Sequence, residues 1–432
     1  MVRVPDESEL EQIEDALVDG DVAYERGTAQ AALRHRDFRI LYFGTFSSNI
    51  GTWMQNVVLG AYAWTLTHNA GYVGLVFFAQ LGPLLFLSTL GGLLADVVDR
   101  RRFLVCAQLA QLVFSFVLAG VALSDHPSEA LIVAAVFAVG IANALGAPGL
   151  SAILPTLVPR EDLPGAVALA SVQMNLSRVI GPIIGAVLYA RFDAGLVFAI
   201  NAVTYLFAVV GLVWARYERR IDARVEERGV ARLLSGARIA RRDPILSYVL
   251  WTLFTFSLFS LAFVGLMPKI AATNLGIDPR SAAYGVLYAS FGFGAAAGAV
   301  SVGTVFAGMR KIKLLRPAFA SFAVVLAVFG AMHTPAFSYP VAALLGYVYF
   351  VAITALSTVL QSQVDNHERG RVMALWIMGF GGTVPLGVLI GGWLAQQVTT
   401  ISVVIVSGAV WALVLAVWSN PKALHEKGAP DV

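Results

Sequence analysis

Charged residues are scarce in this sequence. Lys, Arg, Asp and Glu together make up 13% of the 432 residues, whereas hydrophobic residues make up 58%. Soluble globular domains use about 25% charged and about 45–50% apolar residues. This balance excludes an ordinary soluble domain and indicates a chain that crosses a lipid bilayer many times.

Cysteine and metal-ligand patterns are also nearly absent. The single Cys106 excludes a disulfide within the chain. No phosphate-binding P-loop is present, which argues against transport driven by the chain's own ATP hydrolysis. We therefore expect no cofactor and no metal. The histidines, which show no ligand spacing, are His35, His68, His126, His333, His367 and His425.

The chain has a small net charge of +3, and its basic residues lie in short loops between apolar runs. A membrane explains this distribution better than a nucleic acid, so no nucleic-acid partner is expected. The first residues are acidic and polar, without the basic start and apolar core of a signal peptide. We expect residues 1–37 to form a cytoplasmic tail.

Long apolar runs account for most of the chain. A helix needs about 20 apolar residues to cross the hydrocarbon core of a bilayer. Runs of this size predict an all-α membrane protein with twelve transmembrane helices. The predicted spans are residues 38–67, 71–98, 103–124, 130–158, 164–190, 194–215, 244–273, 281–307, 312–333, 337–364, 372–397 and 401–418.

The distribution of Lys and Arg predicts the orientation of these spans, because positively charged loops stay in the cytoplasm. With both termini inside, only Arg191, Lys269 and Arg280 fall on the outer side. The arginine-rich stretch 216–243 is then a cytoplasmic linker between two six-helix bundles, 38–215 and 244–419. Residues 420–432 form a C-terminal cytoplasmic tail.

The two predicted bundles show an internal repeat. An offset of 206 residues aligns the fifth span with the eleventh and pairs Gly181 and Gly185 with Gly387 and Gly391. Two pseudo-symmetric bundles related by an axis along the membrane normal are a known transporter architecture. In that architecture the substrate binds near the bilayer midplane, between the halves.

A cluster of charged residues separates the second and third spans and must lie at a bilayer face. It belongs to the stretch from Gly92 to Leu104, with the pattern Gly-x-Leu-Ala-Asp-x-x-Asp-Arg-Arg-x-x-Leu. Its pattern resembles the loop between the second and third helices of the major facilitator superfamily of transporters. The resemblance implies a carrier with the major facilitator fold. It also implies a gate at the inner face, formed by Gly92, Asp96, Asp99, Arg100 and Arg101.

The same resemblance implies a place for each gate residue. Asp96 would lie near the start of the eleventh helix, where the helix dipole favours a carboxylate. Arg100 and Arg101 would bind acids or carbonyl groups at neighbouring cytoplasmic ends, although arginines here could also simply follow the positive-inside bias. Asp99 replaces a glycine that is usual in the superfamily. This variant resembles the efflux branch that includes the enterobactin exporter.

The fifth span carries a second resemblance. Gly181, Pro182 and Gly185 are similar to the fifth-helix signature of major facilitator exporters. The resemblance implies a helix-packing role, since small residues and a proline let helices approach closely and kink. The same residues are common packing devices in any membrane helix.

Arg178 is the one charge deep within a predicted span. A central Arg costs about 2.5–3.5 kcal/mol on insertion scales, so it should face a wet cavity, a buried partner or an anionic ligand. We expect it to bind substrate or take part in coupling, with Gln173 and Asn175 beside it. The alternative is that Arg178 only holds the fifth helix to its neighbours.

Further polar residues within the spans are candidates to line the same cavity. They are Asn49, Trp53, Asn56, Gln80 and Asn143. Asn49, Trp53 and Asn56 share one face of the first span at i, i+4 and i+7. For each amide, a hydrogen bond to another helix is a competing interpretation.

These features predict a secondary transporter in the cytoplasmic membrane that exports a small amphipathic or anionic molecule, siderophore-like or drug-like, as a monomer. Uptake or facilitated diffusion is an alternative, because no carboxylate near a span centre identifies proton coupling. A multi-span enzyme or receptor is an alternative of another class, but neither a buried catalytic pair nor a large ligand domain is visible.

Overall fold

The computed structural model describes residues 26–216, 230–365, 368–397 and 400–419. Within those ranges the secondary structure is helical, which confirms the predicted all-α class. The first group of elements is α2 (Ala29–Arg34), α3 (Arg36–Thr67), α4 (Ala70–Leu81), α5 (Pro83–Val97), α6 (Arg100–Ala122), α7 (Glu129–Ile153), the 3-10 helix η1 (Leu154–Thr156), α8 (Leu163–Arg191) and α9 (Ala194–Trp214). The second group is α10 (Val230–Arg242), α11 (Pro244–Ser260), α12 (Ala262–Thr273), α13 (Ala282–Gly303), α14 (Lys311–Ala331), α15 (Pro335–Gln363), α16 (Arg369–Gln397) and α17 (Ser402–Trp418).

Ten helical segments of the described chain are long and apolar enough to cross a membrane. α17 is apolar but has 17 residues, and α3, with 32 residues, is not among the ten. The count of twelve spans therefore stays a prediction. Large apolar side chains such as Trp251 and Val417 are 68% and 69% exposed on the bundle surface, as lipid contact requires.

Side-chain caps fix where several of these helices begin. Asn69, Asp99, Ser128, Asp243 and Ser281 precede α4, α6, α7, α11 and α13, and each accepts a hydrogen bond from a backbone N–H of the first turn. Such caps satisfy donors that the helix itself leaves unpaired.

Two predicted spans consist of two helices each. The second span is interrupted between α4 and α5 at Gly82, where Pro83 begins the new helix and supplies no N–H. The seventh span is interrupted between α11 and α12 at Leu261. Both interruptions lie close to the cavity described below, because Leu81 and Val264 line it.

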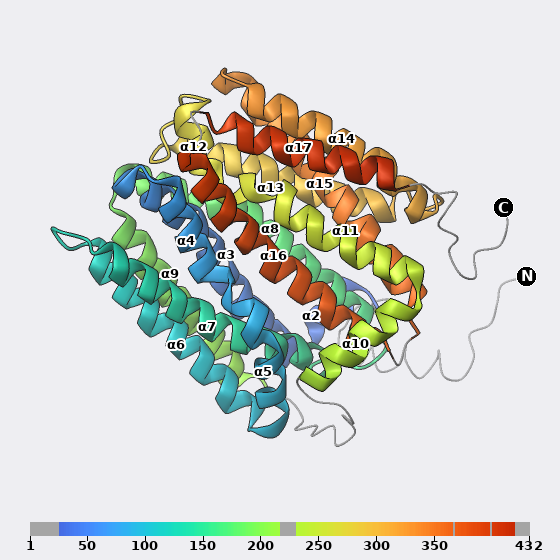
Figure 1. Ribbon diagram of the computed structural model, residues 1–432. Helices are drawn as coiled ribbons and strands as arrows, with labels where there is room; N and C mark the ends of the chain where they lie inside the picture. Colours follow the sequence, from blue (N-terminus) through green and yellow to red (C-terminus); the bar gives the residue numbers. More distant parts are fainter. Residues whose placement is uncertain (1–25, 217–229, 366–367, 398–399, 420–432) are drawn as a thin grey trace, which may run out of the picture.

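Most of the helices α3 to α9 lie on one side of the molecule and most of α11 to α17 on the other, while α8 and α16 overlap in the middle of the view in Figure 1. In the first group, α8 packs closely on α3. A Cβ on Gly181 would lie 2.6 Å from the Cβ of Trp53, and a Cβ on Gly185 would lie 2.8 Å from the carbonyl oxygen of Met54. Glycine is required at both positions for this approach.

In the second group, α13 and α15 form an equally close pair. A Cβ on Gly346 would lie 2.0 Å from the carbonyl oxygen of Phe291, and one on Gly294 would lie 1.7 Å from that of Ala343. Because backbone atoms cannot rotate away as side chains do, these glycines hold the two helices together as a unit.

Two of the helix pairs along which the two groups meet are packed closely. α4 packs on α16, where a Cβ on Gly74 would lie 2.8 Å from the carbonyl oxygen of Val388. α8 packs on α13, where a Cβ on Gly285 would lie 2.2 Å from the Cβ of Ala186. These four residues lie in the helix halves that the predicted orientation places toward the outside, so the two groups contact each other at the predicted outer end.

The predicted linker and tails contain both described and undescribed residues. Residues 1–25, 217–229 and 420–432 lie outside the described part of the chain. Within the linker, α10 lies against the start of α16, because a Cβ on Gly236 would approach the carbonyl oxygen of Arg371 to 2.6 Å. Within the N-terminal segment, α2 is a single short helix ahead of α3.

Candidate functional site

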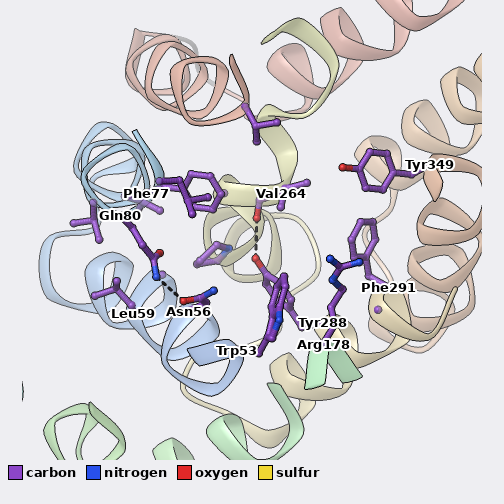
Figure 2. Close-up of a pocket in the computed structure, with 18 of the residues that line it drawn as sticks. Trp53, Asn56, Leu59, Phe77, Gln80, Arg178, Val264, Tyr288, Phe291 and Tyr349 are labelled. Carbon is purple, nitrogen blue, oxygen red and sulfur yellow. Dashed lines mark hydrogen bonds between the residues drawn. The ribbon is translucent and has the colours of Figure 1, made fainter. Parts of the chain in front are cut away.

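A cavity of about 240 Å³ lies between the two groups of helices. Its walls come from α3, α4 and α8 on one side and from α12, α13, α15 and α16 on the other (Figure 2). The wall is rich in aromatic rings, which are Trp53, Phe77, Tyr288, Phe291, Tyr349, Phe350 and Phe380. Such a wall suits a ligand with apolar or planar parts.

Arg178 is the charged residue of this wall. Its guanidinium carbon lies 4.9 Å from the ring centroid of Trp53 and 4.9 Å from that of Phe350. The Nε atom is buried and has no hydrogen-bond partner. Figure 2 shows the side chain extending into the cavity from α8. The aromatic rings therefore contact the cation, and its buried Nε–H group is left without a hydrogen bond.

The cavity wall contains Arg178 but no Asp or Glu among its lining residues. A cation held in a low-dielectric site without an acid is costly unless a ligand supplies the negative charge. The electrostatics of the cavity therefore favour an organic anion over a cation.

Two hydrogen bonds occupy other polar groups of the wall. The Gln80 amide nitrogen donates to the Asn56 side-chain oxygen at 2.5 Å, and the Tyr288 hydroxyl donates to the Val264 carbonyl oxygen at 2.9 Å (Figure 2). The first bond joins α4 to α3, and the second joins α13 to α12. These polar groups therefore form hydrogen bonds within the protein. Arg178 is the residue of the wall that can bind a charged group of a ligand.

The structure brings four of the sequence-predicted residues together in the cavity wall, namely Trp53, Asn56, Gln80 and Arg178. Asn49 and Asn143 are partly buried and are not part of this wall.

The two amides beside Arg178 also lie outside the wall. Gln173 is buried and donates to the Thr45 hydroxyl of α3 at 3.1 Å. Asn175 donates to the Ser171 carbonyl oxygen one turn back in its own helix at 2.9 Å. Both bonds are of the structural kind that competes with a role in substrate binding.

The predicted inner gate is only partly covered by the structure. The surroundings of Gly92 and the side chain of Asp96 lie outside what the structure describes. Asp99 accepts a hydrogen bond from the Arg102 N–H at 3.0 Å and so caps α6. The gate position of Asp96 stays a prediction.

The two arginines of that loop reach neighbouring helix ends. Arg101 donates to the carbonyl oxygens of Leu212 at 2.8 Å and Val213 at 2.6 Å, and also to that of Ala215. Arg100 donates to the carbonyl oxygen of Ala152 at 3.5 Å. Arg101 therefore binds the unpaired carbonyls at the end of α9, where a cation is favourable.

A contact at the outer end was not anticipated from the sequence. Arg280, in the loop before α13, lies 3.5 Å from the Asp193 carboxylate and donates to the Tyr189 carbonyl oxygen at 3.4 Å. Its guanidinium carbon also lies 5.4 Å from the Tyr189 ring centroid. The only signal in the sequence was an acid and a base in two different outer loops, which does not specify a pair.

Another contact fixes the start of α8. Asp162 accepts hydrogen bonds from the Gly27 N–H at 3.0 Å and lies 2.8 Å from Nε2 of His35. The His35 hydrogen bond, followed by that of Gly27, holds the pKa of Asp162 below its ordinary value. The segment before α2 is thereby joined to the start of α8, the helix that carries Arg178.

The chain is similar to known membrane proteins over most of its length. The model of a family described as transmembrane secretion effector matches residues 27–429. The chain is 27% identical over 373 residues to the staphyloferrin A transporter of Staphylococcus aureus, which covers 82% of this chain and 88% of that protein. It is 25% identical over 375 residues to the enterobactin exporter EntS of Citrobacter koseri, covering 87% and 89% of the two chains.

Solved structures agree on the fold. The nucleoside transporter NupG superposes with a TM-score of 0.71 at 13% identity over 90% of this chain and 100% of that chain. An auto-inhibited peptide transporter of the POT family superposes with a TM-score of 0.73 at 12% identity over 91% and 99%. At these identities the likeness shows the fold alone, and it confirms the major facilitator architecture.

Proposed function

The chain belongs to the transmembrane secretion effector family of the major facilitator superfamily, and on that premise we propose that it exports a small organic anion. The anion carries apolar or planar groups and is siderophore-like or drug-like. Transport proceeds by alternating access across the cytoplasmic membrane, and the protein acts as a monomer with both termini in the cytoplasm.

The observation that carries this proposal is the Arg178 guanidinium in an aromatic cavity between the two helix groups. A guanidinium presents a planar set of N–H donors that fits a carboxylate or another planar anion with two parallel hydrogen bonds. Each hydrogen bond to a charged group contributes about 1.5–3 kcal/mol. The surrounding rings then bind the apolar part of the same molecule.

The relatives support both the direction and the size class of the cargo. One curated relative is called an enterobactin exporter and another a staphyloferrin A transporter. Export of a small molecule is thus the transport mode that fits this chain. The family consists of transporters, so an enzyme is not proposed.

Alternating access assigns roles to the contacts between the helix groups. We propose that the contacts of α4 with α16 and of α8 with α13 close the outer end while cargo enters the cavity from the cytoplasm. The predicted inner gate at Asp96, Asp99, Arg100 and Arg101 closes the opposite end in the other state. The bundles 38–215 and 244–419 are the bodies that rock against each other.

Flux measurements test the proposal. Inside-out vesicles carrying the protein should accumulate labelled catecholate and carboxylate siderophores, which are anions, assayed with and without a proton gradient. Macrolides, which are not anions, complete the panel. We expect Arg178→Ala to reduce uptake of the anionic compounds and Arg178→Lys to retain part of it. Equal transport of anions by wild type and Arg178→Ala, at equal protein levels, would contradict the assignment.

The vesicle assay also separates the alternatives. Accumulation only in right-side-out vesicles would indicate an uptake carrier. A dependence on the proton gradient would identify coupling, and flux down the cargo gradient alone would identify a uniporter.

A further inference from the structure

Two rings from opposite sides of the cavity contact one guanidinium. Trp53 lies on α3 with Arg178's own group of helices, whereas Phe350 lies on α15 with the other group. We propose that Phe350 is the residue that sets the affinity of Arg178 for the transported anion, raising it while the outer end is closed and lowering it when the halves move. This inference rests on the proposed function.

Arg178 and Trp53 belong to one rigid unit. α8 and α3 touch at Gly181, where a Cβ would lie 2.6 Å from the Trp53 Cβ and 2.8 Å from the Ile50 carbonyl oxygen. Gly181 lies three residues after Arg178, on the next part of the same helix. Any motion of α8 that keeps this packing therefore carries Arg178 and Trp53 together.

Phe350 belongs to a different rigid unit. It lies four residues after Gly346, one helical turn along α15. A Cβ on Gly346 would lie 2.0 Å from the Phe291 carbonyl oxygen, so α15 is packed backbone to backbone on α13 at this level. Phe350 therefore moves with α13.

The boundary between the two units passes next to Arg178. A Cβ on Gly292 of α13 would lie 2.9 Å from the carbonyl oxygen of Arg178, and the pair of helices continues in contact to Gly285 and Ala186 toward the outer end. Opening the outer end must separate α8 from α13 along this line. The contact of Arg178 with Trp53 persists through that motion, and its contact with Phe350 lengthens.

The motion therefore changes how strongly the Arg178 side chain is immobilised before an anion binds. Two rings contact the guanidinium in the present arrangement, and its buried Nε makes no hydrogen bond. Immobilising a long side chain before binding removes a cost of roughly two- to tenfold in affinity. An anion is thus bound more tightly with the outer end closed and is released more readily after the outer end opens.

The experiment uses the full chain in nanodiscs with two probes, 1-naphthoate and its neutral isostere 1-naphthamide. Asp193→Cys and Arg280→Cys, in a Cys106→Ser background because Cys106 is exposed, allow a short reducible crosslinker to hold the outer end closed. Dissociation constants are measured by calorimetry before and after cleavage of the crosslinker.

We expect the crosslinked protein to bind naphthoate about two- to tenfold more tightly than the cleaved protein, with no such difference for naphthamide. Phe350→Leu should abolish this difference, and Phe350→Tyr should retain it. Phe380→Leu removes another ring of the cavity that does not contact Arg178, so it should weaken both probes alike and preserve the crosslink effect.

The outcomes separate the two proposals. The role of Phe350 would be overturned if Phe350→Leu lowered the affinity for both probes to the same degree. It would also be overturned if the effect of the crosslink on naphthoate binding survived in that variant. If Arg178→Ala binds naphthoate as tightly as wild type in both states, the anion site of the proposed function fails instead.

Discussion

The seam between α13 and α15 predicts the effect of adding one methyl group. In Gly346→Ala the new Cβ would meet the Phe291 carbonyl oxygen at 2.0 Å, whereas ordinary contact begins at 3.4 Å. The helices must therefore separate by about 1.4 Å, the difference between these two distances. A second close contact, 2.9 Å to the Ala295 nitrogen, blocks a sideways escape.

Two opposing effects decide the sign of the change in stability. Alanine raises helix propensity over glycine by about 1 kcal/mol. Overpacking in a tight interior costs about 1–3 kcal/mol, and the upper part of that range applies here because backbone atoms on a facing helix cannot rotate away. We expect Gly346→Ala to lower the free energy of unfolding by about 1–2 kcal/mol and to weaken naphthoate binding by displacing Phe350.

The assay is thermal unfolding of the purified protein, followed by tryptophan fluorescence, with naphthoate binding measured in parallel. Gly120→Ala is the matched control, because Gly120 lies inside α6 with nothing within 4 Å of an added Cβ. That control should melt at or slightly above the wild-type temperature. If Gly346→Ala also melted at or above the wild-type temperature, the contact between α13 and α15 would not be rigid.

Three further outcomes follow from contacts near the membrane faces. Arg101→Gln removes charged hydrogen bonds to the end of α9 and should lower unfolding free energy by about 1–3 kcal/mol, measured by chemical unfolding in detergent; an unchanged midpoint would contradict the capping role. Asp193→Asn weakens an exposed pair with Arg280, so electron paramagnetic distance measurements across the outer ends should show an open fraction raised by at most about fivefold; a complete shift would mean that this pair, rather than the helix seams, closes the outer end. The pKa of Asp162 is lowered in the folded protein, so its carboxylate stabilises the fold fully above the unfolded pKa of about 4 and less as the pH falls through the folded pKa. Asp162→Asn should therefore lose less thermal stability than wild type below about pH 4. Parallel plots of melting temperature against pH for the two proteins would refute this.

Much of the fold followed from the apolar runs alone. Lengths near 20 residues predict helices that cross a bilayer, and every predicted run corresponds to one helix or to two consecutive helices. The interruptions at Gly82 and Leu261 were not predicted, because both lie inside continuous apolar stretches. Pro83 was a local signal for the first. The seventh span has no comparable marker at Leu261.

The candidate site was harder to predict, since a polar side chain in a span can be satisfied in two ways. Arg178 has too many donors and too much charge to be satisfied by its own helix, so its position in a cavity follows from its cost in an apolar span. Gln173 and Asn175 each need few partners and find them on α3 and α8. Sequence periodicity cannot distinguish these outcomes for an amide.

Phe350 could not have been identified from the sequence by any of these arguments. It is one of 26 phenylalanines, and an apolar ring in an apolar span carries no signal of its own. Its significance comes from a neighbour that is 172 positions away along the chain. Contacts between distant helices, such as this one, depend on tertiary packing and not on local pattern.

Trp53 touches both the glycine that seats α8 on α3 and the guanidinium that faces the cavity. The Trp53 side chain therefore contributes both to the packing of α8 on α3 and to the wall of the cavity. This double role limits which mutations could adapt the cavity to a new cargo. Replacing Trp53 would change the packing of α8 on α3 together with the ligand selectivity. Altered selectivity should arise more readily on the opposite wall, where the Phe380 ring can change in size without changing a close helix contact at a glycine.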